Sequence, residues 1–139
     1  MRYLLDTCVI SELVKKNPEP KVVARVDAAP EETLLLSAIT IGEIRKGIEK
    51  VRERKRKGDL ERWLGEELLV RFRGQILPLD EEVMLTWGRM LGQLEAKGRS
   101  LPAIDSLIAA LARHHRLALV TRNVKDFAGC EIELLNPWE

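Results

Sequence analysis

The chain alternates short apolar runs of strand length with longer stretches of helical periodicity. Short apolar runs that stop at polar or turn-forming residues are typical of buried strands. They predict strands over residues 3–5, 33–36, 75–79 and 117–120, and a short edge strand over 132–135. Apolar residues spaced three and four apart predict helices over residues 9–14, 22–28, 40–51, 60–72, 80–97 and from 102 onward. Strands that alternate with helices favour an α/β fold with a mostly parallel sheet of about five strands.

Capping residues set the expected ends of the helices. Thr40-Ile-Gly-Glu43 matches a capping box, so the third helix is expected to open at Thr40. Gly58 predicts a break after that helix. Asp80 is a suitable N-cap for a later helix, and Gly98 is a suitable residue just past its end. Pro102 suits the first turn of the last helix.

The bulk composition predicts a single domain over residues 1–139. A chain of 139 residues with 45% hydrophobic and only 4% aromatic residues can bury an aliphatic core of helices packed on a sheet. Charged residues reach 32% but leave a net charge of +1, so net charge does not argue for a nucleic-acid partner. Two distant cysteines form no zinc or disulfide pattern, which fits a reducing cytoplasm. No signal peptide or membrane-spanning run is evident.

Four acids fall at or near the carboxyl ends of the predicted strands, where ligands bind in open α/β sheets. Asp6 directly follows the first strand, and Glu43 lies in the first turn of the helix after the second. Asp105 lies near the start of the helix before the fourth strand, and Asp126 lies in the loop after that strand. Several carboxylates close together need a counter-charge, and Mg²⁺ is a hard cation that takes oxygen ligands. Taken singly, each acid fits a cap, a turn or a helix first turn equally well, so the residues alone leave the metal site open.

Polar and basic neighbours extend this candidate site. Side chains that could orient the carboxylates, or serve only as caps and turns, are Thr7, Ser11, Thr121 and Asn123. Cations on the helix of Glu43 and just beyond it could contact phosphates, and the candidates are Arg45, Lys46, Lys50 and Arg54. The basic tract over residues 52–57 fits either a solvated helix face or a nucleic-acid patch. His114 and His115 lack metal-ligand spacing and suit the last turn of a helix.

Four ordered segments resemble the motifs of PIN-domain proteins, in particular VapC-type and FitB-like toxins. The segments are Leu5-Asp6-Thr7-Cys8-Val9-Ile10-Ser11-Glu12-Leu13, Ser37-Ala-Ile-Thr-Ile-Gly-Glu43-Ile, Pro102-Ala-Ile-Asp105-Ser-Leu-Ile-Ala-Ala and Leu119-Val-Thr-Arg-Asn-Val-Lys-Asp126-Phe. The closing Leu135-Asn-Pro-Trp138 also resembles the FitB-like end. Cys8 stands where the family often has Asn or Ser. The resemblance spans nearly the whole chain, and four motifs in order are a specific signal.

The resemblance implies a PIN fold, an α/β/α sandwich around a parallel sheet, with Mg²⁺- or Mn²⁺-dependent endoribonuclease activity. Asp6 and Asp105 would then be the leading metal ligands, and Glu43 and Asp126 would complete the acidic site directly or through water. The resemblance also implies a homodimer or larger assembly, neutralised by a VapB-type antitoxin in a prokaryotic cytoplasm. The antitoxin groove would run along residues 40–56, so the basic side chains there would face antitoxin as well as RNA.

Two other functions stay open at this point. The first is a catalytically inactive PIN-fold module that binds RNA or protein, although the complete acidic set argues against it. The second is an aspartyl-phosphate receiver domain, which also places an Asp at a strand end. Against it, the chain has no second acid beside Asp6 and no Lys at the end of a later strand.

Overall fold

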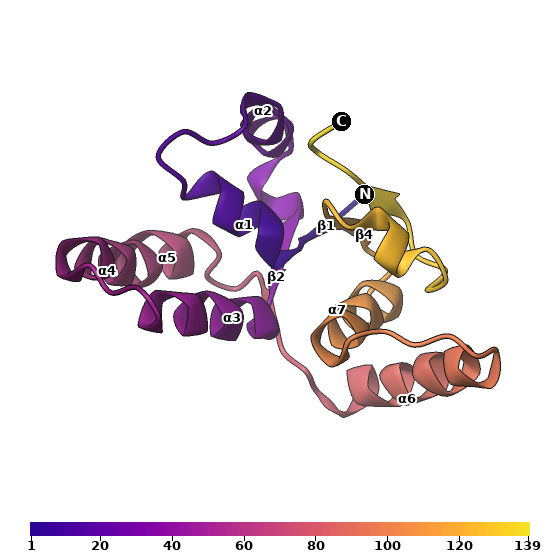
Figure 1. Cartoon of the computed structure of the whole chain (residues 1–139). Helices are drawn as coiled ribbons and strands as arrows, with labels where there is room; N and C mark the ends of the chain where they lie inside the picture. Colours follow the sequence, from indigo (N-terminus) through magenta and orange to yellow (C-terminus); the bar gives the residue numbers. More distant parts are fainter.

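A five-stranded sheet forms the centre of the computed structural model, which describes residues 1–139 (Figure 1). The strand order is β3-β2-β1-β4-β5, and every neighbouring pair is parallel. The strands are β1 Tyr3–Leu5, β2 Leu34–Ser37, β3 Ile76–Leu77, β4 Ala118–Val120 and β5 Leu134–Leu135. The predicted α/β class is confirmed, with a sheet that is parallel throughout.

Helices make all the connections between these strands. They are α1 Thr7–Leu13, α2 Pro20–Ala28, α3 Ala38–Glu49, α4 Arg54–Arg62, α5 Leu69–Arg71, α6 Glu81–Ala96 and α7 Ala103–His114. The π-helical segment η2 Trp63–Leu68 joins α4 to α5, and the short 3-10 helices are η1 Glu31–Thr33 and η3 Val124–Phe127. None of the helices combines the length and the apolar content needed to cross a lipid bilayer.

The sheet separates two hydrophobic cores. Successive strand side chains point to opposite faces, so Leu4 packs with residues of α6 and α7, whereas Leu5 packs with residues of α1 to α4. Leu119 and Val120 divide between the same two cores. Figure 1 shows α6 and α7 on one side of the strands and α1 to α5 on the other. Burial on both faces explains why the strands read as continuous apolar runs.

The chain changes direction across the sheet at β1. β2 and then β3 lie on one side of β1, whereas β4 and then β5 lie on its other side. The crevice between the carboxyl ends of β1 and β4 is therefore a topological switch point, where ligands bind in open α/β sheets. Leu5 and Val120 are paired at the ends of these strands, so Asp6 and Thr121 leave the sheet side by side.

The predicted capping box at the start of α3 is wrong. Ser37, the last residue of β2, caps the helix, and its hydroxyl accepts from the backbone N–H of Ile39 at 2.9 Å. The helix therefore begins at Ala38, and Thr40 is a buried residue inside its first turn. Because the first N–H groups already have a cap, the side chains of Thr40 and Glu43 are free to contact α1 instead.

The predicted break at Gly58 is also wrong, because Gly58 lies inside α4. The chain instead breaks between Lys50, the C-cap of α3, and Glu53, the N-cap of α4. The carboxylate of Glu53 accepts from the backbone N–H groups of Lys55 at 3.1 Å and Arg56 at 2.7 Å. A helix start capped twice offsets the modest cost of one internal glycine.

Candidate active site

Asp6 is fixed at the junction of β1 and β4. Its Oδ1 accepts from the backbone N–H of Thr7 at 2.8 Å, which caps α1, and its Oδ2 accepts from the Thr121 hydroxyl at 2.8 Å. Its own N–H donates to the carbonyl of Val120 at 3.0 Å. The residue is only 6% exposed. One carboxylate is thus held at a defined place and angle by both strands of the switch point.

Glu43 is tied to the same place through Thr7. The Thr7 hydroxyl donates to Glu43 Oε1 at 2.6 Å and lies 2.9 Å from the Thr40 hydroxyl. Thr7 is the first residue of α1, whereas Thr40 and Glu43 lie one turn apart on α3. The start of α1 therefore orients two acids, one by its backbone and one by its side chain.

Asp105 enters the site from the opposite side of the sheet, in the first turn of α7. Burial raises the pKa of the Asp105 carboxyl, and the negative charges of Asp6, Asp126 and Glu43 raise it further. Charges act on one another in this way only over short distances, so the other three acids lie near Asp105. The structure thus gathers the four predicted acids at the carboxyl edge of the sheet.

Asp126 lies on η3, the single 3-10 turn after β4. Its backbone N–H donates to the carbonyl of Asn123 at 3.0 Å, and the N–H of Asn123 donates to the Thr121 hydroxyl at 3.1 Å. Thr121 thus contacts Asp6 directly and anchors the start of the turn that carries Asp126. In contrast to the buried Asp6, Asp126 is exposed at the rim of the site.

The donor chemistry of this centre fits a hard divalent cation. No three His, Cys, Asp or Glu side chains already stand in metal-ligand geometry. Mg²⁺, however, often binds through one or two direct carboxylates and fills its other positions with water. Burial and, after it, the charges of Asp6, Asp126 and Glu43 raise the pKa of Asp105, and a bound cation would offset that effect.

Comparison with known proteins assigns this fold to a family, because the PIN domain family matches residues 3–129. The chain belongs to the PIN domain family. Toxin FitB of Neisseria gonorrhoeae is 37% identical over 97% of each chain, and VapC ribonuclease Y4jK of Sinorhizobium fredii is 36% identical over 98% of this chain and 97% of its own. The crystal structure of FitAcB from Neisseria gonorrhoeae superposes with a TM-score of 0.94, at 36% identity and 99% coverage of both chains.

Of the four side chains predicted to orient the acids, two do contact a carboxylate in this PIN domain and two do not. Thr7 and Thr121 each bond to a carboxylate of the site. Asn123 takes part through its backbone N–H rather than its side chain. Ser11 is exposed on α1, and its hydroxyl forms no hydrogen bond. Sequence reasoning missed Thr40, whose position three residues before Glu43 on a helix was the available signal.

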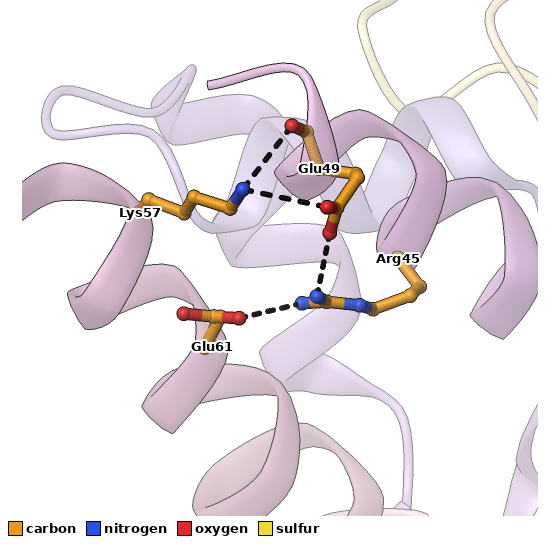
Figure 2. A network of polar contacts seen from close by, with 4 residues as sticks. All are labelled: Arg45, Glu49, Lys57 and Glu61. Carbon is orange, nitrogen blue, oxygen red and sulfur yellow. Dashed lines mark hydrogen bonds and ion pairs between the residues drawn. The ribbon is translucent and has the colours of Figure 1, made fainter. Parts of the chain in front are cut away.

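The predicted basic contacts of the PIN domain divide in two groups. Arg45 lies in an ion-pair network with two acids, at 2.7 Å from Glu49 and 3.1 Å from Glu61, and Lys57 approaches Glu49 at 3.6 Å (Figure 2). Arg45 thus joins α3 to α4 and has less charge to offer a ligand. The other three predicted cations, Lys46, Lys50 and Arg54, are exposed and form no ion pair.

Proposed function

We propose that this PIN-domain protein, as one domain over residues 1–139, is a metal-dependent endoribonuclease and the toxin of a VapBC-type pair. One observation carries the proposal: Asp6, Asp126 and Glu43 lie near enough to Asp105, at the switch point of a parallel sheet, for their charges to add to burial in raising its pKa. A structural cap or turn does not require such a convergence. The names of two relatives, a toxin and a VapC ribonuclease, support the same activity.

Asp6 and Asp105 would hold Mg²⁺ or Mn²⁺, with Glu43 and Asp126 completing the site directly or through water. When bound, such an ion lowers the pKa of a coordinated water and neutralises charge at a phosphodiester. The protein supplies the positioning. Thr121 and the N–H of Thr7 fix both oxygens of Asp6, and the Thr7 hydroxyl fixes one oxygen of Glu43.

The proposed partners are RNA and a VapB-type antitoxin. The antitoxin would lie along residues 40–56, the segment that carries the exposed cations Lys46, Lys50 and Arg54. The active species is proposed to be a homodimer, which the antitoxin can join into a larger assembly. Because its substrate is cellular RNA, the protein would act in the cytoplasm.

Cleavage of total cellular RNA by the purified, antitoxin-free protein tests this function. We expect discrete fragments with Mg²⁺ or Mn²⁺ and none with chelator. Asp105→Ala is expected to abolish the fragments, whereas Asp27→Ala is a matched control because Asp27 is an exposed acid on α2, remote from the site. If the folded protein cuts nothing with either ion, the ribonuclease proposal fails and an RNA- or protein-binding module takes its place.

Thr121→Val is expected to slow cleavage about tenfold to a hundredfold, the range for losing a partner that orients a metal ligand. The substitution removes the donor to Asp6 Oδ2 and the acceptor of the Asn123 N–H. Leaving these polar groups unpaired should also lower the free energy of unfolding by about 1–3 kcal/mol. Thr121→Ser keeps the hydroxyl and should retain most of the cleavage rate. Equal rates for Thr121→Val and the wild type would show that this hydroxyl does not position Asp6.

A further inference from the structure

A hollow of about 450 Å³ lies directly beside the acidic site. It is formed by the loop between α6 and α7 and by the segment that starts in η3. Its polar lining consists of Arg99, Ser100, Lys125 and Asp126, and the rest is apolar or glycine. Asp126 therefore belongs both to the acidic centre and to the wall of this hollow.

The charge of the hollow is opposite to that of the acidic centre. Two cations, Arg99 and Lys125, line it together with the single acid Asp126. Both cations are exposed, and neither forms an ion pair within the chain. An exposed, unpaired Arg beside a hydroxyl such as that of Ser100 is a suitable arrangement for a phosphate group.

Gly129 places the guanidinium of Arg99. A Cβ at this position would lie 2.5 Å from Arg99 Nη1 and 3.4 Å from Leu94 Cδ2. The Arg99 side chain thus lies directly on the glycine backbone, in space that any other residue would fill. Because the clashing atom is the far end of a flexible side chain, a methyl group there would displace the guanidinium without a large change to the fold.

We propose that this hollow binds a phosphate of the RNA strand next to the phosphodiester that is cut. The inference rests on the proposed ribonuclease function and adds a substrate subsite to it. Asp126 lies near Asp105 and also lines the hollow, so a strand with its scissile phosphate at the acidic centre would bring a neighbouring phosphate to Arg99 and Lys125 in the same hollow. The acids repel the neighbouring phosphates, whereas these two cations attract them.

RNA binding is measured in an Asp105→Asn background, which is expected to cut far too slowly to degrade the RNA, so that binding at the subsite is measured without catalysis. Arg99→Ala is expected to weaken binding of a short single-stranded RNA about tenfold in fluorescence anisotropy, the effect of one lost charge-assisted bond. The slope of log affinity against log salt should fall by about 0.7, the value for one phosphate contact on a single strand. Arg73→Ala is the control, since Arg73 is exposed just before β3, at the amino end of the sheet.

Gly129→Ala tests the placement of the charge separately from its presence. The variant keeps both cations, and we expect it to weaken RNA binding in the same direction as Arg99→Ala. Gly88→Ala is its control, because a Cβ at Gly88 meets nothing within 4 Å. If Gly129→Ala fails to fold, Arg99→Lys replaces it, and this variant should keep the salt slope but lose part of the affinity.

A substrate with one uncharged methylphosphonate identifies the phosphate. In otherwise wild-type protein, neutralising one phosphate beside the cut should slow cleavage about tenfold, whereas in Arg99→Ala the same change should have little effect. Unchanged RNA affinity and salt slope in Arg99→Ala would overturn the subsite, and so would loss of antitoxin binding alone. The absence of any cleavage by the wild type would instead overturn the ribonuclease proposal, while the binding comparison would still decide the subsite.

Discussion

Asp105→Asn is expected to reduce RNA cleavage by about a thousandfold, while it stabilises the metal-free protein. The loss should exceed the tenfold to hundredfold typical of residues that only orient a metal ligand, because Asp105 is proposed to be a ligand itself. The stabilisation follows from the site's electrostatics. Burial and three neighbouring carboxylates disfavour the charged form of Asp105, and Asn keeps the shape of the side chain without that charge.

The sign of the pH dependence follows from the raised pKa of Asp105. A raised pKa means that the folded protein binds this proton more tightly than the unfolded chain does. The ionised group therefore lowers stability at neutral pH. This cost disappears as the pH falls through the raised pKa towards the ordinary value of about 3.9. The stability advantage of Asp105→Asn should accordingly be greatest near neutral pH and shrink in acid.

Urea unfolding with chelator, at neutral and at acid pH, measures this difference. The same titration with Mg²⁺ should reverse the order, because the wild type gains stability from a bound ion and the variant gains less. Undiminished cleavage by Asp105→Asn would contradict its role as a ligand. A variant less stable than the wild type in chelator at neutral pH would contradict the electrostatic account.

Phe127→Ala is expected to lower the free energy of unfolding by about 3–5 kcal/mol, the cost of emptying a large buried aromatic site. Phe127 is 1% exposed and ends η3 inside the core formed with α6 and α7. The same single turn carries Asp126. Loss of the aromatic anchor should therefore release one acid of the site, and cleavage per folded molecule should fall as well.

Phe72→Ala is the matched control for this coupling. Phe72 is fully buried in the other core, on the far side of the sheet from α6 and α7, and it carries no residue of the acidic centre. We expect a similar loss of stability, measured by denaturant unfolding, but unchanged cleavage once the folded fraction is taken into account. Where Phe127→Ala is too unstable to purify, Phe127→Leu should show both effects at a smaller size. Equal activity per folded molecule in the Phe127 and Phe72 variants would show that the position of η3 does not affect cleavage.

Local patterns predicted the strands and the positions of the acids well, because both depend on sequence neighbours. Asp6 follows a strand that is apolar enough to be recognised alone, and parallel strands bring their ends to one edge. The start of α3 was not predictable in the same way. Ser37 and Thr40 are both good caps, and only the end of β2 at Ser37 decides between them.

Contacts between distant elements account for the remaining differences. Arg45 forms an ion pair with Glu61, which lies on another helix, and helical spacing alone cannot predict that contact. The bond from Thr7 to Glu43 likewise depends on how α1 crosses α3. Arg99 and Gly129 meet only because α6 and η3 both reach the carboxyl edge of the sheet. Sequence periodicity predicts each element, but not which side chains of different elements meet.

The order of the strands has a consequence for synthesis of the protein on the ribosome. Residues 6 and 43 leave the ribosome first, whereas β4, which holds Asp6 through Thr121, and η3, which carries Asp126, are made about 75 to 120 residues later. The central pair β1 and β4 joins segments more than a hundred positions apart in the numbering, such as Leu5 and Val120. A nascent chain thus lacks two of the four acids until residues 105 and 126 have been made. The acidic centre therefore cannot assemble until β4 has paired with β1, however early Asp6 and Glu43 are made.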